Sequence, residues 1–262
     1  MINAEKTVLI NGKKFDLAGR LYVPAEPVHG QVVLAHSYKS SMEKPLIQYA
    51  AETFQKRGFA TLRFDFRGHG NSRGGLEDFC YNASVEDVSQ AIEYLNREPK
   101  QYLHSKKTIL FGTSIGALAA LLYPGDVTKQ VLVSSVTNER EIYEKYKSQI
   151  EDQAEELDLT GSIEIVNRKI GKPDKKFRIG KEFVRDMQLA RARATERYFQ
   201  LDIPTMLAYG LDDEGIDHSV FQNVEESNPL VIASPFDTDH SFNEPEVQEE
   251  LMTYVLAWLG MY

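Results

Sequence analysis

The hydrophobic positions of this chain follow two patterns that alternate along its length. Continuous apolar runs are typical of strands buried on both faces of a parallel sheet. Such runs occupy 30–37, 59–66, 106–114, 129–136, 203–210 and 229–235. Segments with helical character lie between them, at 45–58, 82–98, 115–123 and 219–226. The chain therefore predicts buried strands connected by helices.

The two ends of the chain have their own patterns. Residues 6–10 and 14–24 alternate between apolar and polar side chains, which predicts half-buried antiparallel strands. The apolar segment 250–262 predicts a C-terminal helix packed on the core. Together with the alternation between them, these segments predict an α/β protein with a doubly wound sheet.

The alternation is interrupted between residues 136 and 201, where charged helical segments at 138–157 and 182–199 flank a stretch that predicts a hairpin or short strands. We interpret 137–200 as a cap or lid inserted into a core formed by 1–136 and 201–262, although a charged excursion is also typical of a solvated surface. Several aromatic side chains of the insertion could line a substrate pocket or pack within the insertion itself: Tyr143, Tyr146, Phe177, Phe183, Tyr198 and Phe199. The basic run 167–181 could dock an acidic carrier protein; we favour a solvated hairpin.

Composition narrows the possible partners and the cellular location. The 262 residues carry 30 Lys and Arg against 39 Asp and Glu, a net charge of −9, which argues against nucleic-acid binding. The single cysteine, Cys80, excludes an internal disulfide and a cysteine-based metal cluster, and we expect it to be inert. Because no secretion signal and no membrane-spanning run is evident, we expect a cytoplasmic protein.

The sequence Gly112-Thr113-Ser114-Ile115-Gly116 lies between a predicted buried strand and an apolar helix. This G-x-S-x-G pattern at a sharp strand-to-helix turn presents a serine hydroxyl above the edge of the sheet. Glycines without Cβ atoms let strand and helix approach closely at such a corner. The backbone N–H of Ile115, at the start of the helix, is available for a developing oxyanion.

A serine nucleophile needs a base and an acid, and the order expected after this turn is serine, acid, histidine. Asp212 and Asp213 follow one late strand, and His240 follows the last strand. His240 is the one histidine between the last strand and the last helix. These residues predict a Ser114–His240–aspartate triad, with either aspartate as the acid.

Four motifs resemble the α/β-hydrolase superfamily along nearly the whole chain: LAHSYKSS at 34–41, DFRGHGNS at 65–72, GTSIG at 112–116, and YGLDD at 209–213 with TDHSF at 238–242. The nearest subgroup is similar to serine esterases of the feruloyl and cinnamoyl esterase type; acyl thioesterases and acyltransferases are also similar. The resemblance implies a mostly parallel, doubly wound eight-stranded sheet with an inserted cap.

The resemblance also assigns residues. The family's acid lies three residues after the strand-ending glycine, which corresponds to Asp213. The second oxyanion donor corresponds to the backbone N–H of Tyr38. The chain departs from the family at Ser37, where a glycine is usual; if the loop needs a positive φ there, Ser37 is strained. We expect His36 and the loop around Arg67 to be structural, with Arg67 paired to a carboxylate.

The predicted function is carboxylic ester hydrolysis through an acyl-enzyme on Ser114, without a metal or cofactor. One alternative keeps the triad but acts on a thioester-linked acyl group, as a thioesterase or acyltransferase. Another is a non-enzymatic ligand-binding protein on the same scaffold. A peptidase ranks lower, because no acidic pair is placed to bind a free N-terminus. The partner in each enzymatic case is a small-molecule acyl ester or thioester.

Overall fold

The computed structural model describes residues 5–25, 29–97, 107–137, 139–167, 173–189 and 193–261, with the side chains of 139–142, 189 and 193 left out. Its main element is an eight-stranded sheet in the order β1-β2-β4-β3-β5-β6-β9-β10. The strands are β1 (Lys6–Ile10), β2 (Leu17–Tyr22), β3 (Gln31–Ala35), β4 (Ala60–Phe64), β5 (Thr108–Thr113), β6 (Lys129–Val133), β9 (Thr205–Gly210) and β10 (Val231–Phe236). Strand β2 pairs antiparallel with β1 and β4, and all other pairs are parallel.

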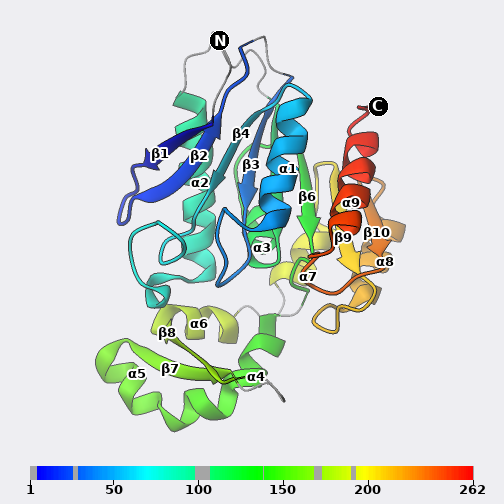
Figure 1. Ribbon diagram of the computed structural model, residues 1–262. Helices are drawn as coiled ribbons and strands as arrows, with labels where there is room; N and C mark the ends of the chain where they lie inside the picture. Colours follow the sequence, from blue (N-terminus) through cyan, green and yellow to red (C-terminus); the bar gives the residue numbers. More distant parts are fainter. Residues whose placement is uncertain are drawn as a thin grey trace.

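Helices cover both faces of this sheet (Figure 1). The helices of the main body are α1 (Pro45–Lys56), α2 (Tyr81–Arg97), α3 (Ile115–Leu122), α7 (Arg193–Phe199), α8 (His218–Ser227) and α9 (Pro245–Trp258), with the short 3-10 helix η1 (Leu76–Asp78). Successive side chains of a strand point to opposite faces. Accordingly, Val32 and Leu34 of β3 pack with α1 and α9, while Val33 packs on the side of α2 and α3. The two faces bury separate cores, as expected for a doubly wound sheet.

The segment between β6 and β9 forms a smaller body at the carboxyl ends of the central strands (Figure 1). It contains α4 (Glu139–Asp152), α5 (Ala154–Thr160), β7 (Ser162–Asn167), β8 (Lys175–Gly180) and α6 (Lys181–Leu189). Strands β7 and β8 pair antiparallel as a separate sheet. We call residues 139–189 the insertion. Helix α7 follows it and contacts α3 and α8 of the main body.

The elements agree with the predicted alternation, with differences at a few boundaries. The helical segment expected over 138–157 is two helices, because Gln153 leaves the helical path between α4 and α5. The segment expected over 182–199 is also two helices, α6 and α7, and 190–192 between them lies outside the described residues. The predicted hairpin forms from β7 and β8, with 168–172 likewise outside the described residues. The last helix begins at Pro245, earlier than its apolar stretch indicated.

Candidate active site

Ser114 occupies a sharp corner between β5 and α3, which we call the elbow. Its φ of 53° and ψ of −115° lie outside the regions that L-residues usually adopt. Strained backbone of this kind persists only where the surrounding structure determines it. A Cβ on Gly112 would lie 2.4 Å from the carbonyl oxygen of Gly116, and one on Gly116 would lie 2.3 Å from that of Ala35. Both glycines are therefore required for the corner, as the sequence pattern predicted.

The structure brings the three predicted side chains into contact. Ser114 Oγ lies 2.9 Å from His240 Nε2. His240 Nδ1 lies 2.6 Å from Asp213 Oδ2. The other carboxylate oxygen, Asp213 Oδ1, accepts a hydrogen bond of 3.0 Å from the backbone N–H of Gly215, which the sequence pattern did not predict. With Nδ1–H donating to the carboxylate, His240 Nε2 presents a lone pair to the serine hydroxyl.

The neighbouring candidate acid lies outside this arrangement. Asp212 is exposed, and its backbone N–H donates to the carbonyl of Thr238 over 3.1 Å. The Asp213 side chain is 2% exposed, whereas the His240 side chain is 43% exposed. A buried carboxylate thus orients an accessible imidazole, and of the two aspartates Asp213 is the one in contact with it.

The loop that follows β3 answers the question that the sequence left open at Ser37. Positive φ falls on Lys39, at 53°, and not on Ser37. The condition under which Ser37 would be strained is therefore not met, and its hydroxyl lies 2.9 Å from Thr113 Oγ1, beside Ser114. The Tyr38 ring packs against His69 and Phe79 of the main body, with centroids 5.5 and 5.4 Å apart. Burial raises the pKa of the Tyr38 hydroxyl above its ordinary value.

His36 is a structural hydrogen-bonding residue, as predicted. Its Nδ1–H donates to the carbonyl of Ser37 over 2.7 Å, and its Nε2 accepts from the N–H of Phe66 over 3.1 Å. Burial lowers the pKa of His36 to about 3, with His69 adding to the effect. Because both ring nitrogens are engaged and the ring stays neutral, His36 is not available as a base.

The loop at 65–72 is also structural. Arg67 donates to the buried carboxylate of Asp87 through Nε at 2.9 Å and Nη2 at 2.6 Å. It reaches Glu86 as well, at 2.6 Å. Asp65 accepts from the backbone N–H groups of Met42 and Asn71, at 2.6 and 2.8 Å. These contacts fix the loop, and the prediction that Arg67 pairs with a carboxylate is confirmed.

The remaining sequence candidates differ in their surroundings. Burial raises the pKa of the Cys80 thiol to about 11, so it is protonated at neutral pH, in agreement with its expected inertness. Tyr198 is fully buried against Phe221, and its hydroxyl bonds to Ser135. Phe199 is exposed. Of the insertion's aromatic side chains, Phe177 and Phe183 face the main body through contacts with Tyr38.

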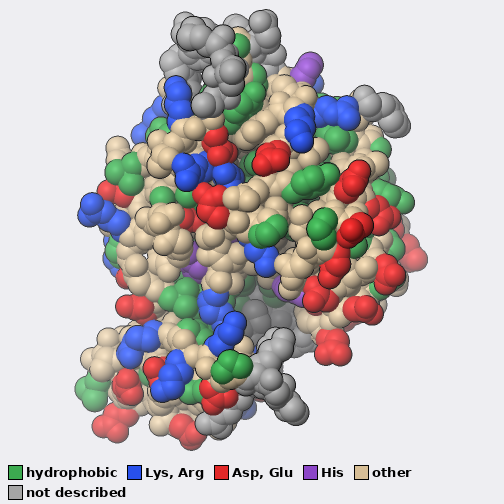
Figure 2. Space-filling view, viewed as in Figure 1, with side chains coloured by type: hydrophobic (Ala, Val, Ile, Leu, Met, Phe, Trp, Pro, Cys, Tyr) green, Lys and Arg blue, Asp and Glu red, His purple; other side chains and the backbone are tan. Residues whose placement is uncertain are grey.

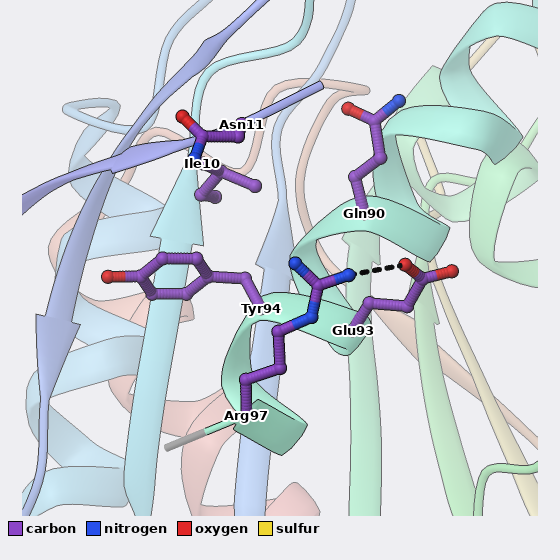
Figure 3. Close-up of a pocket in the computed structure, with 6 residues that line it drawn as sticks. All are labelled: Ile10, Asn11, Gln90, Glu93, Tyr94 and Arg97. Carbon is purple, nitrogen blue, oxygen red and sulfur yellow. Dashed lines mark hydrogen bonds and ion pairs between the residues drawn. The ribbon is translucent and has the colours of Figure 1, made fainter. Parts of the chain in front are cut away.

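A separate pocket of about 140 Å³ lies between the end of β1 and α2 (Figure 3). Its described lining residues are Ile10, Asn11, Gln90, Glu93, Tyr94 and Arg97. Arg97 donates to Glu93 across its rim over 3.3 Å, as Figure 3 shows. These described lining residues include no serine, cysteine or histidine.

No group of three or more His, Cys, Asp or Glu side chains in the described ranges is placed to hold a metal ion. Among the helices that the structure describes, none combines the length and apolar character needed to cross a membrane.

The sheet order, the elbow and the crossover helices on both faces define this protein as an α/β-hydrolase. A family model described as serine aminopeptidase, S33, matches residues 26–230, and the chain belongs to this family of hydrolases. The predicted fold class is thereby confirmed.

Solved structures with the same fold include Est1E from Butyrivibrio proteoclasticus with ferulic acid bound, at a TM-score of 0.72 and 17% identity, covering 97% of this chain and 99% of that one. An esterase from Pyrococcus furiosus superposes with a TM-score of 0.72 at 20% identity, covering 98% of this chain and 91% of that one. At such identities the likeness shows the fold alone.

Similarity to curated proteins is local. Thiohydrolase aneE from Aspergillus aculeatus is 34% identical over 104 residues, which span 37% of this chain and 31% of that protein. The chain thus matches about a third of this relative's own length.

Proposed function

We propose that this chain is a serine hydrolase that cleaves carboxylic esters through an acyl-enzyme on Ser114. The observation that carries the proposal is the continuous contact from Ser114 Oγ to His240 Nε2, at 2.9 Å, and from His240 Nδ1 to Asp213 Oδ2, at 2.6 Å. A serine hydroxyl becomes an effective nucleophile when a positioned base removes its proton. The exposure of His240 beside the nearly buried Asp213 suits a base that must meet substrate and leaving group.

In the proposed reaction, Ser114 Oγ attacks the ester carbonyl while His240 Nε2 takes the hydroxyl proton. Asp213 holds the Nδ1–H and stabilises the positive charge that develops on the imidazole. His240 then delivers the proton to the leaving alcohol, whose bond to the carbonyl carbon breaks. A water molecule then gives a proton to His240 while its oxygen attacks the acyl carbon. The bond from this carbon to Ser114 Oγ breaks, His240 returns the proton to Oγ, and the carboxylic acid leaves.

The charge that forms on the carbonyl oxygen needs backbone donors. Ile115 is the first residue of α3, so its N–H has no partner within the helix. We assign it as one oxyanion donor and the N–H of Tyr38 as the second. Each such donor typically contributes about 3 kcal/mol to lowering the barrier. We further propose that the insertion, 139–189, acts as the cap over this site. Helix α7, which also falls within the segment 137–200 expected to form the cap, contacts α3 and α8 of the main body instead.

Thioester cleavage is the second candidate, because the local relative aneE is named a thiohydrolase. The same triad suits a thioester, whose leaving group is a thiolate. Docking of an acidic carrier has less support. Three of the four described cations of the basic run lie beside acidic partners: Lys176 with Glu164, Arg178 with Glu156, and Lys181 with Asp158. Figure 2 shows basic and acidic side chains intermingled over the surface of the insertion.

The test is a substrate panel with wild type and Ser114→Ala assayed side by side. The panel contains p-nitrophenyl esters of two to sixteen carbons, an aryl-propenoate ester, an acyl thioester and an aminoacyl p-nitroanilide. We expect ester turnover by wild type alone. Preference for the thioester would favour the second candidate, and preference for the anilide would favour a peptidase. Equal activity in Ser114→Ala would refute a serine mechanism.

A further inference from the structure

The ring of Tyr38 is packed between the main body and the insertion. On one side it meets His69 and Phe79. On the other it meets Phe183 of α6, with centroids 5.2 Å apart, and Phe177 of β8, at 6.4 Å. The backbone of the same residue carries the N–H that we assign to the oxyanion. Tyr38 therefore connects the insertion to the atoms that would stabilise the transition state.

The next residue strengthens this connection. Lys39 has a φ of 53°, in the left-handed region that is unfavourable for a residue with a Cβ. Its ammonium nitrogen lies 3.7 Å from the centroid of the Phe177 ring, a close cation–π contact. Phe177 thus contacts the side chains of Tyr38 and Lys39, two consecutive residues of the loop after β3, which we call the oxyanion loop. The contact to Lys39 stabilises a strained conformation.

The insertion is itself held firmly against the main body near these rings. A Cβ on Gly180, at the end of β8, would lie 1.9 Å from the carbonyl oxygen of Glu77 in η1, so the two backbones are in direct contact. Asp186 of α6 accepts hydrogen bonds from the backbone and the side-chain amide of Asn82, both at 3.1 Å. Phe183, which lies between these two contacts in sequence, is 2% exposed. The insertion can therefore act as a rigid support.

We propose that Phe177 and Phe183 are positioning residues that hold the oxyanion loop in its productive conformation through Tyr38 and Lys39. The inference rests on the proposed function of the Ser114 site. A displacement of a catalytic group by about 1 Å can reduce the rate by about 100-fold. Loss of support need not abolish the donor, so we expect Phe177→Ala and Phe183→Ala to lower kcat by about 10-fold each.

The test separates positioning from direct contact with substrate by varying the acyl group. Steady-state kinetics are measured with p-nitrophenyl esters of two, four and eight carbons, and kcat is normalised to the fraction of Ser114 that a phosphonate labels at completion. Positioning predicts the same loss of kcat for every ester, with KM changed less than threefold. The rate of phosphonate labelling should fall by a similar factor, since that reaction also places an oxygen between the oxyanion donors.

Two further variants serve as controls. Ile163→Ala removes a buried aliphatic side chain from the same small sheet, where Ile163 pairs with Ile179. It should lower the melting temperature while kcat stays within twofold of wild type. Phe177→Tyr keeps an aromatic ring at the half-buried position and should restore kcat to within about threefold. If Phe183→Ala does not fold, Phe177→Ala alone decides.

The outcomes distinguish this inference from the function on which it rests. Unchanged kcat in a folded Phe177→Ala would overturn the positioning role while leaving the esterase intact. Losses that appear in KM and grow with acyl length would also overturn it, because they indicate direct substrate contact. An equal loss in Ile163→Ala would reduce the effect to general stability. A wild-type chain with neither turnover nor labelling would refute the proposed function, and this inference with it.

Discussion

Two regions of the molecule carry the same residue types, aspartate, histidine and serine, in very different surroundings. In the first region, which consists of His36 and the loop 65–72, these side chains bond to backbone groups. Asp65 accepts from the N–H groups of Met42 and Asn71, and His36 bonds to the carbonyl of Ser37 and the N–H of Phe66. In the Ser114 site the side chains contact one another, and the histidine is 43% exposed. Residue type alone therefore does not define a reactive site; the partners and the accessibility of the imidazole do.

The largest effect that would test this comparison is the loss of His240. In serine hydrolases, removing one member of a catalytic triad lowers kcat by about 10⁴-fold or more. We expect His240→Ala to lose turnover to this extent in an ester assay while its melting temperature stays close to that of wild type. The comparison variant is Ser72→Ala in the structural loop, where the hydroxyl bonds to backbone groups of Ala18 and Asp65, and it should keep kcat per folded molecule. If Ser72→Ala instead lost turnover while folded, the division between the two regions would be wrong.

The adjacent aspartates allow the comparison to be made within one loop. Asp213→Asn should lower kcat by about 10⁴-fold, because an amide no longer holds His240 in the productive tautomer. Asp212→Asn should leave kcat unchanged, since Asp212 is exposed and the carboxylate at His240 Nδ1 is that of Asp213. Parallel kinetics of the two variants measure this, and the opposite ranking would mean that Asp212 orients the imidazole in solution.

The structural region should respond in stability. Arg67→Met would leave the fully buried Asp87 without its cation, and breaking a buried pair in this way typically costs about 3–5 kcal/mol. Denaturant unfolding should show this loss, while kcat per folded molecule is retained. Arg97→Met, which removes an exposed pair with Glu93, is the control and should unfold almost as wild type does. A similar cost for both substitutions would contradict the special role of the buried pair.

The smallest expected effect is a pH dependence of stability. Burial lowers the pKa of His36 to about 3, and it also lowers the pKa of His69. Because the folded-state pKa lies below the unfolded value of about 6.5, the stabilisation is fully present above pH 6.5 and is lost as the pH falls toward 3. Each such histidine contributes a slope of up to about 1.4 kcal/mol per pH unit. Between pH 6 and 4, the free energy of unfolding of His36→Gln should depend less on pH than that of wild type. An unchanged slope would mean that His36 is already protonated in the fold.

The sheet and the elbow could be predicted from the sequence because their signals are local. Buried strands are continuous apolar runs, and Gly112 and Gly116 mark a corner where no Cβ fits. The acid and the histidine that accompany Ser114 could be assigned to two late loops, because the expected chain order is serine, acid, histidine. The choice between Asp212 and Asp213 depended on a family resemblance, since both follow the same strand.

Other features depend on tertiary contacts that the sequence pattern does not contain. The positive φ falls on Lys39, where the Phe177 ring from a distant segment meets its ammonium group. Nothing near Ser37 or Lys39 in the sequence distinguishes the two positions. Similarly, Phe177, Phe183 and Tyr198 are all aromatic residues within 137–200, yet Tyr198 packs into the main body while the other two meet Tyr38.

The most direct test of the account is to identify the residue that a serine-directed phosphonate modifies. Wild type, His240→Ala and Ser114→Ala are treated with the reagent, and the adduct is located by peptide mass spectrometry. The account predicts one adduct, on Ser114 of wild type, with labelling greatly slowed in His240→Ala and absent in Ser114→Ala. An unlabelled Ser114 in folded wild type, or an adduct on another serine such as Ser72, would contradict it.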